Sequence, residues 1–242
     1  MLPNSLHVFP VMYKAYVFSI RNSFNFLFYN ECDTQARLST NGVISFDPTL
    51  ATGQFHFWTP AAGATIPNNT DGALRDGNIF GPVHDIYPGA PGVPAASYWI
   101  KYGVKGSAPF RVFTFTFFNA PQFGCTSLRT SQMIMLYEAT NVVEMYVYHK
   151  PVCTTWAGGR AALGIQNTAG NQGVAAPGRN TAQYVIGDAT LANGEAWQFY
   201  PNGTPTYDIV WYDDSTGAVV GNSNTINVCP AVTTTYTAEL TY

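Results

Sequence analysis

The period of two in its apolar residues is the feature that most constrains the fold of this chain. In the segment SFNFLFYN, Phe24, Phe26 and Phe28 stand at every second position, so an extended strand would carry all three rings on one face. The aromatic run at residues 112–117 has the same character. No segment shows the 3.6-residue apolar period of an amphipathic helix. The sequence therefore predicts an all-β protein.

Turn signals divide the chain into further strands. Asn41–Gly42 predicts a tight hairpin turn, because both residues tolerate positive φ. Residues 131–149 predict a long hairpin that turns at 139–141. Residues 51–97 are rich in Gly, Pro, Ala and Asn and predict a long irregular region, within which NIFGPVHDI indicates a short buried strand. Any binding surface is expected in these long loops.

A boundary is expected at about residues 201–205, where Pro, Asn and Gly gather. Residues 1–201 are predicted to form a β-sandwich of the jelly-roll kind, and their N-terminal part reads as strands of this domain. Residues 202–242 contain three strand-like runs separated by turn signals. The chain is therefore predicted to have a large and a small β domain.

The charge content excludes some classes of function. Charged residues make up only 10% of the 242 residues and the formal net charge is -3, whereas nucleic-acid binding requires clustered Lys and Arg. No apolar run reaches the roughly 18 residues that a membrane-spanning helix needs. Aromatic residues, at 15%, are abundant, as is common in secreted β proteins. We expect neither a nucleic-acid partner nor a transmembrane segment.

The four cysteines are Cys32, Cys125, Cys153 and Cys229. They form no C-x-x-C pair and no zinc-binding pattern with histidine. Cys125 and Cys153 flank the predicted hairpin, where a disulfide would close the open ends of two paired strands. Four buried thiols are the alternative. We favour a disulfide formed in an oxidising, extracellular compartment.

The glycine-rich stretch Ala161–Asn180 is expected to contain one strand, ALGIQN, followed by a loop, GNQGVAAPGRN. Arg179 and Asn180 are the predicted anchors of this loop. We expect the guanidinium of Arg179 to donate to backbone carbonyls and to stack on Trp156 or Trp197. Contact with a sugar is the alternative for Arg179. A phosphate site is not expected, because no helix N-terminus follows the loop.

No catalytic residue is predicted. The four histidines lie in different segments, and only His84 is adjacent to a carboxylate, that of Asp85. Neighbouring residues on a strand point to opposite faces. No serine stands in a G-x-S-x-G motif.

No cofactor is expected either. Asp76, Asn78 and Asp85 offer the oxygen ligands that calcium prefers and are the weak metal candidates. The alternative is that Asp85 caps a turn before Pro88. Glu138 and Asn141 flank the tip of the 131–149 hairpin, where a contact surface and a structural turn are the two interpretations.

An ordered set of motifs runs along most of the chain. It consists of STNGVISFD, NIFGPVHDIYPG, YGVKGSAPFRVFTFTFFNAPQFGC, QMIMLYEATNVVEMYVYHKPVC, WAGGRAALGIQN, APGRN and EAWQFYPNG. This set resembles a domain of large cell-surface proteins from Bacteroidetes, the gliding-motility-associated adhesins exported by the type IX secretion system. The resemblance covers about residues 23–242. It departs at Phe28-Tyr29-Asn30, where Phe-Tyr-Gly is expected, and in the proline-rich loop at 88–97.

The resemblance implies an extracellular protein on the bacterial cell surface. It also implies that residues 202–242 form an immunoglobulin-like or PKD-like module, incomplete because such a fold needs about seven strands. Cys229 is then either free or paired with Cys32. No enzymatic activity is implied.

Three functions follow as expectations. The first is a non-enzymatic adhesion or gliding-motility module that contacts a surface polysaccharide or another cell-surface protein. The second is a self-assembling filament subunit, in which a strand of a neighbouring copy completes the small module, with LHVFPVMYKAYVFSI as the candidate donor. The third is a secreted carbohydrate-binding module that uses exposed aromatic residues such as Trp58 or Trp99.

Overall fold

The structure is a computed structural model in which residues 7–8, 16–50, 53–54, 58–184, 194–201 and 208–241 are described. The chain divides into two compact units, Met1–Tyr200 and Pro201–Tyr242. All described strand pairs are antiparallel, and the only helices among the described residues are two short 3-10 turns, η1 (Ala95–Ser97) and η2 (Ala157–Gly159). None of the described helices has the length and apolar character that crossing a membrane requires.

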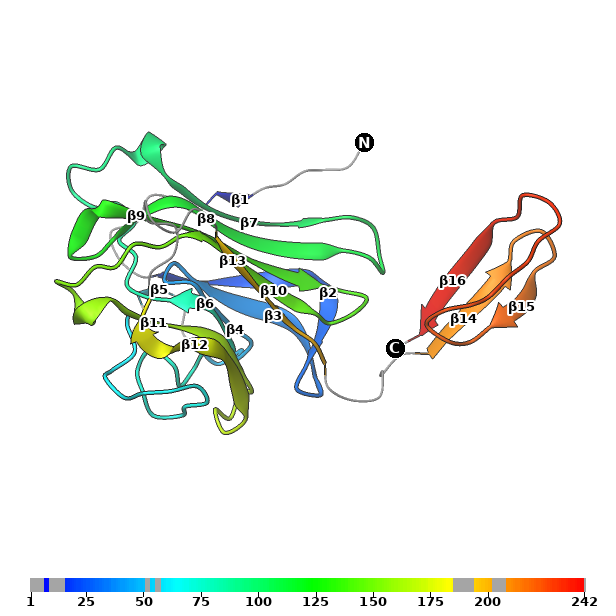
Figure 1. The fold of residues 1–242 in the computed structure, drawn as a ribbon, viewed down its shortest axis with the longest axis horizontal. Coiled ribbons are helices and arrows are strands. Elements are labelled where there is room, and N and C mark those ends of the chain that lie inside the picture. The colour runs from blue at the N-terminus through cyan, green and yellow to red at the C-terminus, as the bar shows by residue number, and fades with distance from the viewer. Residues whose placement is uncertain are drawn as a thin grey trace. The chain divides into compact units, whose positions relative to one another are not determined.

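The first sheet has six strands in the order β1-β7-β8-β9-β10-β13 (Figure 1). Its strands are β1 (His7–Val8), β7 (Trp99–Lys105), β8 (Val112–Gln122), β9 (Cys125–Tyr137), β10 (Val143–His149) and β13 (Glu195–Phe199). Strands β7 to β10 follow one another in sequence and in space, because short turns join them. The predicted hairpin at 131–149 forms the pair β9–β10.

The second sheet has seven strands in the order β12-β11-β6-β4-β3-β2-β5. Its strands are β2 (Tyr16–Phe28), β3 (Glu31–Ser39), β4 (Val43–Ser45), β5 (Gly53–Gln54), β6 (Ile79–Val83), β11 (Arg160–Gln166) and β12 (Gly173–Gln183). The Asn41–Gly42 turn joins β3 to β4, and the buried strand expected in NIFGPVHDI is β6. Both local predictions are confirmed.

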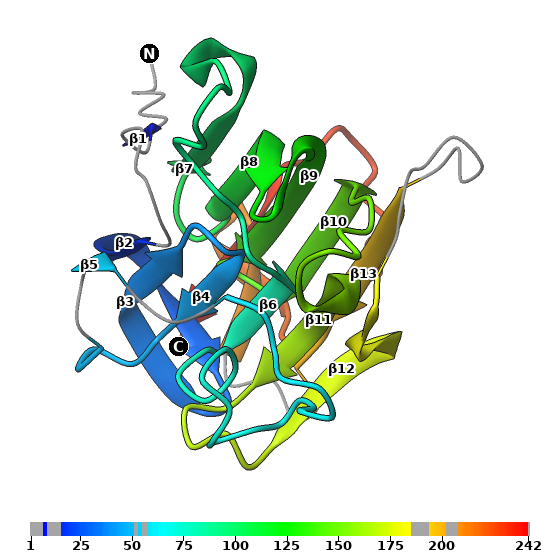
Figure 2. The same ribbon diagram turned by 90° about the vertical axis from the view of Figure 1, so that its left-hand side faces the viewer.

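The two sheets pack face to face and enclose the core, as the end-on view in Figure 2 shows. Phe26 and Phe28 of β2 are buried on the same face, as their spacing predicts. Strand β8 contributes three buried phenylalanine rings, at 113, 115 and 117, while Thr114 and Thr116 point away from the core. Burial of these apolar rings is the main favourable contribution to folding. The predicted all-β sandwich is confirmed.

The segment GNQGVAAPGRN is not a loop, so this expectation is wrong: most of it belongs to β12. Gly164 pairs with Ala175 and Ala162 pairs with Asn180, so that Pro177 and Gly178 lie in a bulge between these two pairs. Strand β12 is at the edge of its sheet, where a proline removes no hydrogen bond from a neighbour. The Pro-Gly pair therefore marks a bulge.

The unit Pro201–Tyr242 contains a three-stranded sheet in the order β15-β14-β16. Its strands are β14 (Asp208–Asp213), β15 (Ala218–Gly221) and β16 (Tyr236–Thr241). In the described part of this unit, residues 208–241, no side chain is fully buried. A single sheet layer has no second layer within these residues to cover its apolar positions.

Candidate functional site

Cys125 and Cys153 form a disulfide with their Cα atoms 5.7 Å apart. Cys125 begins β9, and Cys153 lies in the segment that follows β10, so the bond joins the ends of the paired strands. Cys32 and Cys229, which belong to different units, are free, exposed thiols.

Arg179 anchors β12, but through other partners than expected. Its guanidinium forms an ion pair with Glu195 of β13, with 2.8 Å between Nη2 and Oε2, and lies 4.2 Å from the ring centre of Tyr184. The partners of Arg179 are therefore a carboxylate and a tyrosine, and not the backbone carbonyls and the tryptophan that we expected. Burial lowers the pKa of Arg179, but the hydrogen bond and the charge of Glu195 raise it by more. The pKa of Arg179 is therefore above its usual value. The pair joins the edge strands of the two sheets.

Lys150 lies next to this ion pair and is almost fully buried. Its Nζ donates to the backbone oxygen of Tyr184 at 3.2 Å and lies 5.6 Å from the centre of the Tyr184 ring. Burial, followed by the nearby charge of Arg179, lowers the pKa of Lys150 to about 7. The segment after β10 therefore contains a lysine that loses its charge near neutral pH.

Asn180 anchors a second segment, the loop before β6. Its Oδ1 accepts from the backbone N–H of Ile66 at 2.8 Å, and its Nδ2 donates to the Ile66 oxygen at 3.1 Å. Both hydrogen-bonding groups of one loop residue are thus satisfied by one side chain. The anchoring role predicted for Asn180 is consistent with this geometry.

Gln166, at the end of β11, fixes the same loop over a longer stretch. Its buried Nε2 donates to the backbone oxygens of Leu74 at 2.8 Å and Gly77 at 3.0 Å. Its Oε1 accepts from the backbone N–H of Asn68 at 2.9 Å. The irregular segment before β6 is therefore held against β11 and β12.

Two of the metal candidates are engaged in other contacts. Asp76 forms an ion pair with Arg75 at 3.0 Å. The Oδ1 of Asn78 accepts from the backbone N–H of Phe46 at 2.6 Å, and its Nδ2 donates to the Gln166 oxygen at 3.2 Å. Among the described residues, no three His, Cys, Asp or Glu side chains gather in a way that would hold a metal ion.

His84 and the third metal candidate, Asp85, have separate surroundings. The ring nitrogens of the buried His84 lie 3.2 Å from the Pro82 oxygen and 3.1 Å from Oγ1 of Thr130. Burial, with a smaller contribution from Lys150, lowers the pKa of His84. Burial raises the pKa of Asp85 to about 7, although a hydrogen bond from Trp156 acts to lower it. The two neighbours are thus not coupled as a catalytic pair.

His56 and the side chain of His7 lie outside the described residues. Glu138 and Asn141 are both buried at the tip of the β9–β10 hairpin. Glu138 pairs with Arg111, and the Oδ1 of Asn141 accepts from the backbone N–H of Leu27 at 3.0 Å. These contacts support the structural interpretation of both residues.

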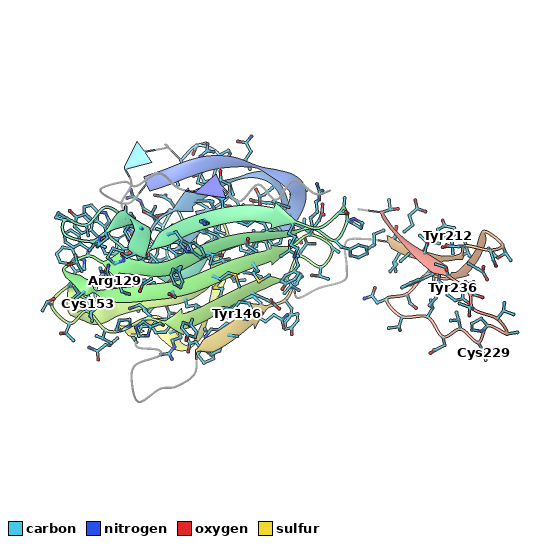
Figure 3. All side chains as sticks on the ribbon, turned by 90° about the horizontal axis from the view of Figure 1, so that it is seen from above. Arg129, Tyr146, Cys153, Tyr212, Cys229 and Tyr236 are labelled. Atoms are coloured by element: carbon cyan, nitrogen blue, oxygen red, sulfur yellow. A yellow bond between two sulfur atoms is a disulfide. The ribbon has the colours of Figure 1, made fainter. Side chains whose placement is uncertain are left out.

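The first sheet exposes a set of aromatic and polar side chains on the side away from the core, which we call the outer face. These side chains come from alternate positions of five strands and are Trp99, Lys101, Thr114, Thr116, Phe118, Met133, Met135, Tyr137, Glu144, Tyr146, Tyr148 and Gln198. Tyr148 is 75% exposed and Phe118 is 50% exposed. Figure 3 looks onto this face and shows Tyr146 on it.

Glu144 is the centre of a hydrogen-bonded cluster on the outer face. Its Oε2 accepts from the hydroxyls of Tyr137 at 2.6 Å and Tyr146 at 2.8 Å, and its Oε1 accepts from Nε2 of Gln198 at 2.8 Å. The hydrogen bond to Glu144 is the largest cause that raises the pKa of Tyr137, to about 12. We call Tyr137, Glu144, Tyr146 and Gln198 the Glu144 cluster.

An aromatic pair lies at the other side of the outer face. The rings of Trp99 and Phe118 stack with their centres 5.4 Å apart, and Nζ of Lys101 lies 4.8 Å from the Trp99 ring. Trp99 is thus placed on a strand of the outer face, whereas Trp58, 40% exposed, precedes the anchored loop. The described part of residues 51–97 is largely held by Gln166 and Asn180, so the outer face is the better candidate site.

Sequence reasoning missed the Glu144 cluster. A signal was present in VEMYVYH, where Glu144, Tyr146 and Tyr148 occupy the positions that alternate with apolar residues. Their alternation with Met145 and Val147 places them on the side opposite the core. What the alternation does not give is Gln198, which reaches Glu144 because β13 pairs with β10.

Comparison with known proteins identifies one relationship. A family model described as NIDO related matches residues 15–201. No curated protein and no solved structure matches the chain. The matched residues include β2 to β13 and therefore the whole outer face, while the unit Pro201–Tyr242 lies almost entirely beyond the match.

Proposed function

The chain belongs to the NIDO-related family, and on this premise we propose that it is a non-enzymatic module of an extracellular protein on the bacterial cell surface, acting in adhesion or gliding motility. The observation that carries the proposal is the outer face. It presents exposed aromatic rings and an ordered hydrogen-bonding cluster on paired strands of one sheet. Such a surface contacts a partner without a change in the fold.

The anchored edges of the sandwich support a role in contact under load. The disulfide joins residues 28 positions apart, and the ion pair between Arg179 and Glu195 links the two sheets. Disulfides form and persist in oxidising compartments, which supports an extracellular location. The ordered motifs that resemble gliding-motility adhesins support the bacterial cell surface.

The adhesion proposal is tested with beads that carry the full chain. The beads are placed under flow on bare glass, on polysaccharide-coated glass and on protein-coated glass, and the detachment force is compared with that of beads carrying serum albumin. We expect stronger retention on at least one surface, and weaker retention for the variant Tyr148→Ala. Retention equal to that of the albumin beads on every surface would contradict the proposal.

A second candidate function is a self-assembling filament subunit, and the unit Pro201–Tyr242 favours it. Within residues 208–241, strands β15 and β16 each have one neighbour, and Ile209, Trp211 and Leu240 are only partly buried. Edge strands with open hydrogen-bonding groups accept a strand from another chain. The described part of the candidate donor segment is engaged elsewhere, since β1 pairs with β7 and β2 with β3. The segment would have to leave these pairings to act as the donor.

Assembly is tested by light scattering of the full chain over a concentration series. A mass that increases with concentration supports a filament subunit. A constant monomer mass at the highest soluble concentration argues against it, and it leaves the adhesion proposal in place.

A further inference from the structure

We propose that the outer face binds an uncharged polysaccharide, with the Glu144 cluster accepting hydrogen bonds from sugar hydroxyls and the exposed aromatic rings stacking on sugar rings. The inference rests on the proposed adhesive function and names the class of ligand. It is carried by the geometry of the Glu144 cluster, by the charge of the outer face and by the arrangement of its aromatic residues.

The Glu144 cluster is rich in acceptors. Tyr137 and Tyr146 each donate their single hydroxyl proton to Glu144, so the lone pairs of both hydroxyl oxygens remain for a ligand. A carboxylate that receives these hydrogen bonds holds the two hydroxyls in fixed directions. The ligand must therefore supply donors, and a sugar hydroxyl supplies one donor at each position of the ring.

The charge of the cluster selects among polysaccharides. The donors to Glu144 are neutral side chains. Glu144 is not a partner in the ion pairs Arg75–Asp76, Arg111–Glu138 and Arg179–Glu195 of the described residues. An uncompensated carboxylate repels an acidic polysaccharide and leaves a neutral one unaffected. The Glu144 cluster thus disfavours uronic acid polymers, while the one basic side chain named on the outer face, Lys101, lies over Trp99 on the other side of the face.

The aromatic residues lie on both sides of the outer face. Tyr146 pairs across the strands with Met133, and Met133 pairs with Thr116. The stacked Trp99–Phe118 pair lies on β7 and β8, whereas Tyr148 lies on β10. Strands are about 4.8 Å apart, so β7 and β10 are separated by about 14 Å. This width suits several linked sugar rings rather than one.

The polar centre of the face disfavours an apolar protein partner. Thr114, Thr116 and Glu144 lie between the aromatic rings. An apolar side chain of a partner protein that covered them would remove water from the Glu144 carboxylate without replacing its hydrogen bonds. A sugar meets both demands of the site, because its hydroxyls replace the lost water and its C–H faces pack on aromatic rings. A polysaccharide therefore fits where an apolar side chain does not.

The test measures binding of the full chain to soluble polysaccharides by isothermal titration calorimetry. The probes are the neutral polymers laminarin, yeast mannan and pullulan and the acidic polymer alginate. We expect saturable binding to at least one neutral polymer and none to alginate. Binding to no neutral polymer, or to alginate more tightly than to any of them, would overturn the inference.

Two variants locate the binding on the outer face. Tyr146→Phe removes one hydroxyl, and Tyr148→Ala removes one ring that is 75% exposed, so neither change disturbs the core. Each is expected to weaken the Kd for the bound neutral polymer about tenfold, as the loss of one hydrogen bond or stacking contact does. Phe110→Ala is the matched control, because Phe110 is 61% exposed in the turn between β7 and β8. Unchanged affinity in both face variants would refute the assignment.

The bead experiment separates this inference from the adhesive function. Beads retained on protein-coated glass in a Tyr148-dependent manner, without binding to any neutral polymer, would refute the ligand class and leave adhesion supported. Binding to a neutral polymer by a chain whose beads are retained on no surface would support the ligand class and refute adhesion.

Discussion

Asn180 satisfies both backbone hydrogen-bonding groups of Ile66, a residue 114 positions earlier in the chain. The strand β12 and the irregular segment before β6 are thereby tied through one side chain. Two hydrogen bonds at a partly buried site are worth about 2 kcal/mol together.

We expect Asn180→Ala to lower the free energy of unfolding by about 2 kcal/mol, because the N–H and C=O of the buried Ile66 lose their partner. Urea unfolding followed by fluorescence measures the change. Asn69→Ala, at an exposed position of the same loop, is the control and should shift stability by less than about 0.5 kcal/mol. Equal effects of the two substitutions would contradict the anchoring role.

The disulfide should stabilise the fold by an amount that grows with the logarithm of the length of the loop that it closes. Cys125 and Cys153 are 28 positions apart, for which loop entropy gives about 3.5 kcal/mol. In the double variant Cys125→Ser/Cys153→Ser, the free energy of unfolding measured in urea is expected to be lower by about this amount. The double variant Cys32→Ser/Cys229→Ser should unfold like the parent protein, because both thiols are free and exposed. A large loss in this second variant would show that these cysteines matter to the fold.

Asp85 should make the fold less stable as pH rises. Its pKa is raised by burial from 3.8 to about 7 in the folded chain. The folded state thus retains a proton that the unfolded state has lost, and the stability present below pH 3.8 is lost as pH rises through 7. Asp85→Asn should remove this part of the pH dependence, measured as unfolding free energy against pH. If the unfolding free energy of Asp85→Asn depended on pH as that of the parent protein does, the raised pKa of Asp85 would be contradicted. Asp208→Asn, at an exposed position, is the control.

Lys150 should act in the opposite direction at higher pH. Burial lowers its pKa from 10.5 to about 7, so between these values the unfolded state binds the proton and the folded state does not. Stability therefore rises with pH across this window. Lys150→Met should flatten the rise and raise stability at pH 7 and below, since no buried charge remains. The same slope in both proteins would show that Lys150 is hydrated when folded.

The charge of Glu144 should be visible in the ionisation of its neighbours. The hydrogen bond to Glu144 is the main reason that the pKa of Tyr137 is raised to about 12. We expect Glu144→Gln to bring this pKa back toward 10, because the amide carries no charge. Tyrosinate absorbance during alkaline titration measures the change, and Glu31→Gln, at an exposed position, is the control. If the pKa of Tyr137 stayed at about 12 in Glu144→Gln, the hydrogen bond between the two side chains would be absent in solution.

Features that depend on a few neighbouring residues were predictable from the sequence. The alternation at Phe26 and Phe28, the Asn41–Gly42 turn and the strand β6 follow from local patterns. Strand β12 was missed because Pro177 and Gly178 are turn residues everywhere except in a bulge at a sheet edge. Whether a segment is at an edge depends on the order of all the strands.

Contacts between distant strands were not predictable. Arg179 stacks on Tyr184 and pairs with Glu195, and neither choice can be derived from the spacing, because it depends on which strands lie at the two sheet edges. Gln198 reaches Glu144 across 54 positions through the pairing of β10 with β13. Single residues of the outer face were readable from their alternation, but their grouping required the register of three strands.

The alternation along β8, β9 and β10 also governs how this domain can diverge. The core residues Phe115, Phe117, Ile134, Leu136, Met145 and Val147 on these strands are each flanked by residues of the outer face, so a substitution at Tyr146 or Thr116 leaves the packing between the sheets unchanged. A deletion of one residue would reverse both faces and is selected against. Descendants of this sequence can therefore acquire new ligand preferences by point mutation while inheriting the same scaffold.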